Sequence, residues 1–174
     1  MEQDFVGTKR WIRQASPYEI YMDEQKLPIH RGTVGFSDIR DLTLGSWKRM
    51  GAQGAFIELN GCGGLQGMYV IEVPGAGAIT AEKHMYEEIF YVLEGRGTTE
   101  IWSGDDANKK QTFEWQPGSL FSPPLNTWHR IVNAASSPAL LVGVTNAPPI
   151  VVGSEKQVII PSPVGNRFYR LKSP

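Results

Sequence analysis

The chain has 174 residues, of which 41% are hydrophobic and 20% charged, and its formal net charge at pH 7 is −1. This length suits one hydrophobic core, and the near-neutral charge excludes strong attraction to nucleic acid or to an anionic membrane. Without a long apolar run or a secretory signal at MEQDFVGTKRW, and with Cys62 as the single cysteine, the sequence indicates a soluble cytoplasmic protein.

The first 45 residues contain one clear helix signal. In Ser16-Pro17-Tyr18-Glu19 a serine cap precedes a proline at the first helical position, and a glutamate follows three residues after the cap. The helix should be short and end before Pro28. Residues 29–47 mix turn residues with brief apolar pieces. We therefore expect residues 1–45 to be an N-terminal arm that packs onto the main domain or a partner subunit.

Strand signals dominate the second region, residues 46–174. Short apolar runs alternate with turn residues in GAFIELNG, GMYVIEVPGAG, IFYVLEGRGTTEIWSG, QTFEWQPGSLF, TWHRIVN and ALLVGVT. Two pairs of runs flank tight turns at Glu94–Gly97 and Gln116–Ser119, so we expect a β-hairpin at each. Strands that recur every ~8–12 residues predict one all-β sandwich or barrel.

Acidic residues and histidines gather in two of these runs. Glu82 and His84 are two residues apart and would share a face of an extended strand, and Glu88 begins the next run. His129 shares a face with Asn133 if TWHRIVN is a strand. A carboxylate among apolar residues is costly unless a cation or a hydrogen bond meets it. One divalent cation would satisfy Glu88, His84 and His129 together.

The two runs resemble the paired motifs of the cupin superfamily over roughly residues 50–150. The first motif is a glycine, five residues, His-x-His, three or four residues, a glutamate, six residues and a glycine. This chain matches it with His84, Glu88 and Gly95. The second motif is a glycine, five residues, Pro-x-Gly, two residues, a histidine, three residues and an asparagine. This chain matches it with Gly118, Pro124, His129 and Asn133.

Three positions depart from the motifs. Asn126 replaces the glycine of Pro-x-Gly, and asparagine is the non-glycine residue that best tolerates a positive φ. Ala76 stands where the first glycine belongs, but Gly75 and Gly77 flank it, so the turn can shift by one residue. Glu82 takes the place of the first histidine, and this departure bears on function.

The resemblance implies a cupin-type antiparallel β-barrel, or jelly roll, preceded by an arm with a short helix, and commonly a homodimer. It also implies one divalent ion, with His84, Glu88 and His129 as ligands. Glu82 is either a fourth ligand or a catalytic general base. Two histidines and a carboxylate are typical of non-haem Fe(II) oxygenases. We therefore expect Fe(II), with Mn(II), Ni(II) and Zn(II) as alternatives.

The leading hypothesis is a metal-dependent enzyme acting on a small organic molecule, in particular a non-haem Fe(II) dioxygenase-type oxidoreductase. A decarboxylase, isomerase or lyase with a non-redox ion would use the same residues. A different class is a non-catalytic cupin that binds a small ligand, in which Glu82 marks a decayed metal site. A storage or scaffold role is a third alternative, because one barrel supports many functions.

The substrate pocket is predicted from neighbours of the ligands: Tyr86, Phe90, Trp128 and Asn133. Arg130 should face the opposite side of its strand from His129, and no other arginine forms an obvious clamp for a carboxylate or phosphate. We therefore expect a neutral or weakly acidic substrate.

Overall fold

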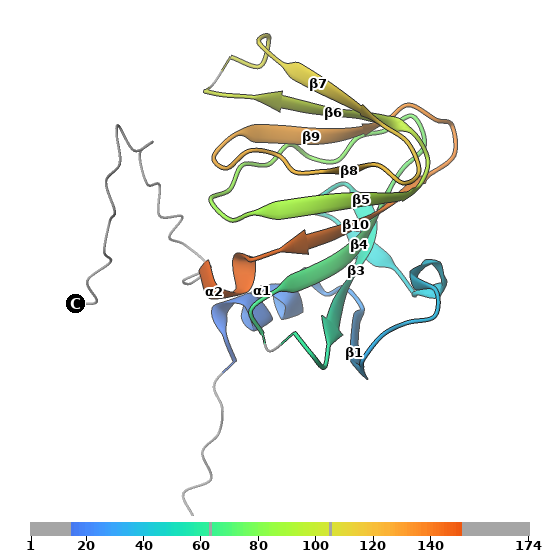
Figure 1. Ribbon diagram of the computed structural model, residues 1–174, viewed down its shortest axis with the longest axis vertical. Helices are drawn as coiled ribbons and strands as arrows, with labels where there is room; N and C mark the ends of the chain where they lie inside the picture. Colours follow the sequence, from blue (N-terminus) through green and yellow to red (C-terminus); the bar gives the residue numbers. More distant parts are fainter. Residues whose placement is uncertain (1–14, 63, 105, 151–174) are drawn as a thin grey trace, which may run out of the picture.

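The computed structural model describes residues 15–150 except residues 63 and 105, and these residues form two β-sheets packed face to face (Figure 1). The larger sheet has the order β1-β3-β4-β10-β5-β8, with β2 paired to β3, and the smaller has the order β7-β6-β9. Residues 1–14 of the predicted arm and 151–174 of the predicted barrel lie outside the described residues. The prediction of an all-β jelly roll is confirmed.

The larger sheet contains seven strands: β1 (Ile29–Thr33), β2 (Gly45–Trp47), β3 (Ala52–Leu59), β4 (Gly67–Val73), β5 (Glu88–Glu94), β8 (Leu120–Phe121) and β10 (Ala139–Thr145). The smaller sheet contains β6 (Gly97–Trp102), β7 (Gln111–Trp115) and β9 (Trp128–Asn133). All pairings are antiparallel except that of β1 with β3, which is parallel.

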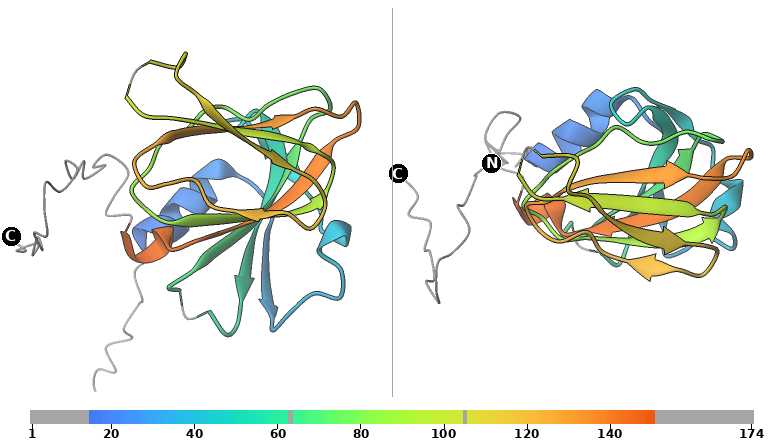
Figure 2. Two further views of the ribbon diagram at one scale, coloured as in Figure 1. Left: turned by 45° about the horizontal axis from the view of Figure 1, so that its top comes forward. Right: turned by 90° about the horizontal axis from the view of Figure 1, so that it is seen from above.

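Helix α1 (Pro17–Gln25) begins at the predicted capping box. The Ser16 hydroxyl accepts a hydrogen bond from the Glu19 amide at 3.2 Å, and the Glu19 carboxylate accepts one from the Ser16 amide at 2.6 Å. Tyr18 and Met22, one turn apart, are buried in the core between the sheets. Helix α2 (Ala147–Ile150) lies beside α1 at one end of the sandwich (Figure 2), and a 3₁₀ turn, η1, spans Ile39–Asp41. None of the helices in the described residues is long and apolar enough to cross a membrane.

Neither predicted hairpin forms. Strand β5 pairs with β8 and β10, whereas β6 pairs with β7 and β9, so the turn at Glu94–Gly97 carries the chain from one sheet to the other. The turn at Gln116–Ser119 does the same between β7 and β8. Gly95 has φ 87°, and a Cβ there would overlap Ala139. Gly95 therefore allows the tight turn by which the chain crosses from one sheet to the other. Such a turn uses the same residue types as a hairpin turn.

Inward and outward side chains alternate as predicted on the two strands that matter for the site. On β5 the inward, buried residues are Glu88, Phe90 and Val92. On β9 they are His129, Ile131 and Asn133. Arg130 faces outward, where its guanidinium pairs with Glu100 at 2.6 Å. The period of two thus directs a carboxylate from one sheet and an imidazole from the other into the interior.

The turn at Ala76 does not shift to a neighbouring glycine. Ala76 itself has φ 50°, in the left-handed region that disfavours a Cβ. A Cβ on Gly75 would overlap the carbonyl group of Ser136, and one on Gly77 would lie 2.8 Å from the Pro74 ring. Both flanking glycines are needed for close backbone approach, so the alanine adopts the strained conformation.

Candidate metal centre

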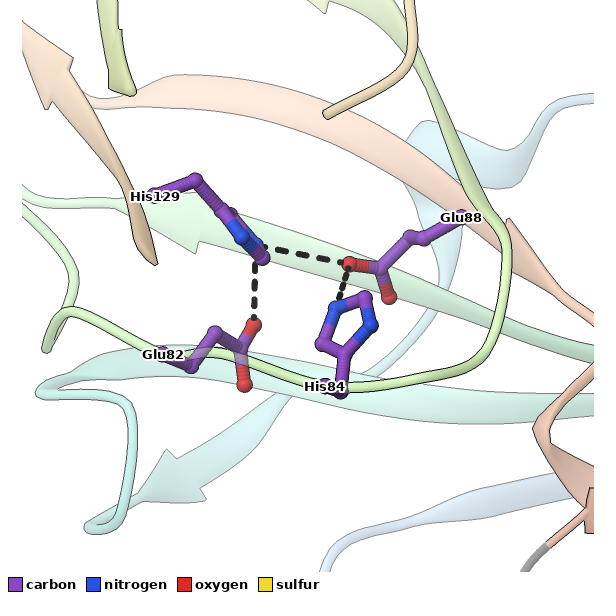
Figure 3. A group of neighbouring side chains, drawn as sticks. All are labelled: Glu82, His84, Glu88 and His129. Carbon is purple, nitrogen blue, oxygen red and sulfur yellow. Dashed lines mark hydrogen bonds and ion pairs between the residues drawn. The ribbon is translucent and has the colours of Figure 1, made fainter. Parts of the chain in front are cut away.

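Four side chains converge in the interior, between the two sheets (Figure 3): Glu82, His84, Glu88 and His129. Each offers one ligand atom, and these atoms all lie within 4.8 Å of one another. Two atoms bonded to one ion at about 2.0–2.3 Å lie at most about 4.6 Å apart. Small side-chain movements would therefore let all four contact a single ion.

Backbone contacts tie the ligand segments together. Residues 81–87 do not form the expected strand but make one isolated bridge, in which the amide and carbonyl groups of Glu82 and His129 exchange hydrogen bonds of 3.0 and 2.9 Å. The Asn126 amide donates to the His84 carbonyl at 2.9 Å, and Asn126 adopts φ 59°, as expected for its position in the motif. The two motifs thus hold each other in place.

The imidazole of His84 is oriented from both sides. Its Nδ1 lies 2.9 Å from the Tyr86 carbonyl oxygen, an acceptor, so Nδ1 carries a proton. Its Nε2 lies 3.1 Å from Glu88 Oε2. A carboxylate oxygen and an unprotonated ring nitrogen repel at that distance, so a proton or a cation must lie between them. A backbone carbonyl that fixes the other ring nitrogen is the usual support of a metal-binding histidine.

His129 is 1% exposed, and neither of its ring nitrogens has a hydrogen-bond partner among the residues that the structure describes. Its Nε2 lies 3.6 Å from Glu82 Oε1 and 3.7 Å from Glu88 Oε2. Burial lowers the pKa of His129, but these two carboxylates outweigh burial and raise the pKa to about 9. An unpaired buried nitrogen costs about 1–3 kcal/mol. A cation between the imidazole and the carboxylates would satisfy Nε2.

Glu88 is 3% exposed, and its two oxygens have different partners. Oε1 accepts a hydrogen bond of 2.6 Å from the Tyr69 hydroxyl, whereas Oε2 faces both imidazoles. Burial favours the neutral acid, but the neighbouring histidines and Tyr69 outweigh it and lower the pKa of Glu88 to about 2. A Cβ on Gly143 would fall inside the ring of Tyr69, so this glycine makes room for the donor.

Glu82 links the centre to a residue that the sequence analysis missed. Its Oε2 accepts a hydrogen bond of 2.9 Å from Arg49 Nη2, while its Oε1 faces His129. Arg49 lies in the turn between β2 and β3, 33 residues before Glu82. No motif marks that turn, so only the fold reveals the contact. Tyr69 was also missed, although strand alternation directs it inward.

A cavity of about 20 Å³, roughly the space of one water molecule, adjoins the centre. Glu82, Glu88 and Arg49 line it together with aromatic rings from α1, β2, β3 and β4. It is polar on the side of the carboxylates and apolar elsewhere. A small molecule larger than water can therefore enter only if a wall moves.

The four residues predicted for the substrate pocket lie in different places. Tyr86 lines the cavity, and its ring stacks on that of His84 with centroids 3.8 Å apart. Phe90 is buried in the core behind the centre. Trp128 is on the outward face of β9, where it stacks on Trp102 at 6.2 Å. The amide of Asn133 donates to three backbone carbonyl groups in neighbouring turns. The positions of Trp128 and Asn133 therefore do not match a pocket role.

The donor set fits a divalent transition metal. Two imidazole nitrogens and two carboxylate oxygens suit iron, manganese, nickel or zinc, and all four groups except His84 are buried. The four residues are thus a candidate site for a divalent ion whose identity the ligands alone leave open.

Comparisons with known proteins agree on the fold. Residues 68–145 match the family model described as a cupin domain. No curated protein sequence matches the chain. Among solved structures, the Cnp3 cupin domain of Schizosaccharomyces pombe superposes with a TM-score of 0.52 and 16% identity over 65% of this chain and 73% of that one.

Two further structures are similar. An oxalate decarboxylase of Lactobacillus farciminis, in a formate complex, has a TM-score of 0.51 and 19% identity over 63% of this chain, which spans 32% of that enzyme. The plu4264 protein of Photorhabdus luminescens has a TM-score of 0.51 and 15% identity over 66% of this chain and 88% of that one. At these identities the likeness concerns the fold. The matched family model and the fold identify residues 68–145 as a cupin domain within a jelly roll.

Proposed function

We propose that this cupin is a metal-dependent enzyme that acts on a small organic molecule, with one divalent ion held by His84, Glu88, His129 and Glu82. The observation that carries the proposal is the buried imidazole of His129, whose Nε2 faces two carboxylates and has no hydrogen-bond partner within the described part of the chain. Fe(II) and oxygen-dependent oxidation are the specific form we favour, because two histidines with a carboxylate are the usual ligands of such enzymes. When bound, the ion would supply Lewis-acid and redox chemistry.

The chain's own residues prepare this site. Tyr69 donates a hydrogen bond that orients Glu88, and the Tyr86 carbonyl holds the proton of His84 on Nδ1, which leaves Nε2 available. Glu82 borders the cavity and is either the fourth ligand or the group that takes a proton from the substrate. The aromatic walls exclude bulk water, which strengthens electrostatic interactions inside.

A non-catalytic, ligand-binding cupin is the second candidate, and one observation favours it. Glu82 is already paired with Arg49, so part of the group is satisfied without an ion. The similar structures include an oxalate decarboxylase and the cupin domain of Cnp3, so the fold does not choose between catalysis and binding. A decarboxylase, isomerase or lyase with a non-redox ion also remains compatible with the four residues.

Metal content tests the proposal. Protein prepared without chelators or a polyhistidine tag should contain about one equivalent of iron, manganese, nickel or zinc by elemental analysis. His129→Ala should lose the metal. His30→Ala is the matched control, because His30 contacts the Thr43 carbonyl on the barrel exterior and should keep it. A wild-type protein that stays metal-free after anaerobic incubation with Fe(II) would support the ligand-binding barrel.

Oxygen chemistry has a separate test that needs no substrate. Nitric oxide binds open positions of Fe(II) much as O₂ does and gives a paramagnetic adduct. Fe(II)-loaded protein should show this adduct by electron paramagnetic resonance, and His129→Ala should not. Stoichiometric iron without an adduct would point to a non-redox role for the site.

Homodimer formation and a cytoplasmic location complete the proposal. Exposed apolar side chains on the outer face of β5 and β8, namely Ile89, Tyr91 and Leu120, support self-association. Light scattering coupled to size-exclusion chromatography gives the mass directly. A monomer at all concentrations would contradict the dimer.

A further inference from the structure

Arg49 forms the accessible wall of the cavity. Its side chain is 46% exposed and projects from the tight turn between β2 and β3, where the Met50 amide donates to the Trp47 carbonyl at 3.0 Å. The opposite walls include Trp47 and Tyr69, which are 3% and 4% exposed and belong to the core. Since the cavity holds about one water molecule, a ligand can enter most readily where Arg49 and Glu82 meet.

The guanidinium of Arg49 has donors to spare. Within the described residues its one contact with a carboxylate is that of Nη2 with Glu82 Oε2, at 2.9 Å, and Glu82 uses one oxygen because the other faces His129. The remaining contacts are from Nη1, at 3.4 Å to the Tyr21 hydroxyl and at 3.3 Å to the Met50 sulfur. A guanidinium carries five N–H donors in a fork that matches both oxygens of a carboxylate. A ligand carboxylate could therefore make a better pair than Glu82 makes now.

When a divalent ion is bound, the charges of the site favour the binding of one more anion. Among the described residues that line the cavity, Arg49 is the one cation, and Glu82 and Glu88 are the carboxylates. Together they leave one net negative charge, which a divalent ion would convert to one net positive charge. A monoanion would then neutralise the site. The surrounding aromatic rings lower the local dielectric constant and make this balance matter more than it would at the surface.

We propose that Arg49 binds the anionic group of the substrate, that this group is the carboxylate of a small organic acid, and that it replaces Glu82 as the partner of Arg49. Glu82 is thereby released toward the centre, where its carboxylate can ligate or accept a proton. A carboxylate carries the single negative charge that the ion-loaded site lacks, whereas a phosphate monoester carries about −1.5 to −2 at pH 7. The charge balance and the identity of the substrate rest on the proposed function, whereas the guanidinium fork of Arg49 is present with or without the ion. The expectation of a neutral or weakly acidic substrate rested on the lack of an obvious arginine clamp, and Arg49 narrows it to an acid.

Acetate and its neutral analogue acetamide are suitable probes, titrated by calorimetry into metal-free and Zn(II)-loaded protein. Arg49→Gln should weaken acetate binding about tenfold to a hundredfold in both forms, the range expected for a lost charge-assisted hydrogen bond. Arg49→Lys, which keeps the charge but loses the fork, should weaken it less. Arg130→Gln is the matched control, because Arg130 faces outward and pairs with Glu100, and it should bind acetate like wild type.

Release of Glu82 has its own test. Glu82→Gln should raise the affinity of the metal-free protein for acetate, and the gain should disappear in Glu82→Gln/Arg49→Gln if it acts through Arg49. The proposal is overturned if both Arg49 variants bind acetate like wild type, if acetamide binds as tightly as acetate, or if phosphate binds more tightly than either. Metal content distinguishes failure of the proposed metalloenzyme from failure of the carboxylate site at Arg49. A protein without metal that still needs Arg49 for acetate would refute the enzyme and leave the carboxylate site standing.

Discussion

Replacing Tyr69 with phenylalanine tests whether the centre depends on a single buried donor. The change deletes a hydrogen bond of 2.6 Å to Glu88 Oε1 and keeps the ring, which fills the space opposite Gly143. Both partners are at most 4% exposed, so water cannot replace the donor readily. A hydrogen bond to a charged group is worth about 1.5–3 kcal/mol. Since about 1.4 kcal/mol corresponds to a factor of ten, metal affinity should fall roughly 10- to 100-fold.

The assay is a competition titration of Zn(II) or Fe(II) against a chromophoric chelator, with urea unfolding of the metal-free protein beside it. Loss of about 2 kcal/mol in the free energy of unfolding should lower Tm by about 4–8 °C. Tyr91→Phe is the matched control, because Tyr91 lies on the outward face of β5 and is 44% exposed. If Tyr69→Phe binds metal as tightly as Tyr91→Phe does, Glu88 does not depend on this donor and the assigned support of the centre is wrong.

Three other substitutions probe the charge, the strained turn and the packing. In metal-free protein the raised pKa of His129 predicts a contribution to the free energy of unfolding that is fully present below about pH 6.5 and is lost, by on the order of 3 kcal/mol, as the pH rises through about 9. Urea titrations across this range should show the slope, and His129→Gln should flatten it. Ala76→Gly should stabilise the protein by about 0.5–1 kcal/mol, seen as a higher Tm, because glycine tolerates φ 50°. Gly143→Ala should destabilise it by about 1–3 kcal/mol and weaken metal binding, because the added Cβ displaces Tyr69, and an unchanged Tm would contradict that packing.

Strand alternation explains why much of the site was predictable. A period of two is local, so IFYVLEG and TWHRIVN reveal which side chains share a face before any pairing is known. That rule placed Glu88 and His129 inward and Arg130 outward, as the structure has them. The same rule, applied to Trp128, places it outward with Arg130. Proximity in sequence to His129 was therefore a poor reason to assign Trp128 to the pocket.

The rest of the fold depends on information that no single segment carries. A glycine turn looks alike whether the strands around it pair or enter opposite sheets, so the turns after β5 and β7 were read as hairpins. Arg49 reaches Glu82 only because β2 folds back on β3 at the end of the barrel where the segment after β4 returns. Such contacts follow from the strand topology. The residues on either side of Arg49, Lys48 and Met50, do not predict them.

The carboxylate at position 82 and the arginine at position 49 form a matched pair. An imidazole at position 82 offers one lone pair, so it would either bind an ion or accept a hydrogen bond from Arg49, and the other ring nitrogen would be a second donor facing the guanidinium. A carboxylate has two oxygens and serves both sides at once, with Oε1 toward His129 and Oε2 toward Arg49. It also neutralises a cation that would otherwise oppose a divalent ion nearby. The departure from the cupin motif is therefore better explained as an adaptation to Arg49, and to the anion we infer it binds, than as decay of the metal site.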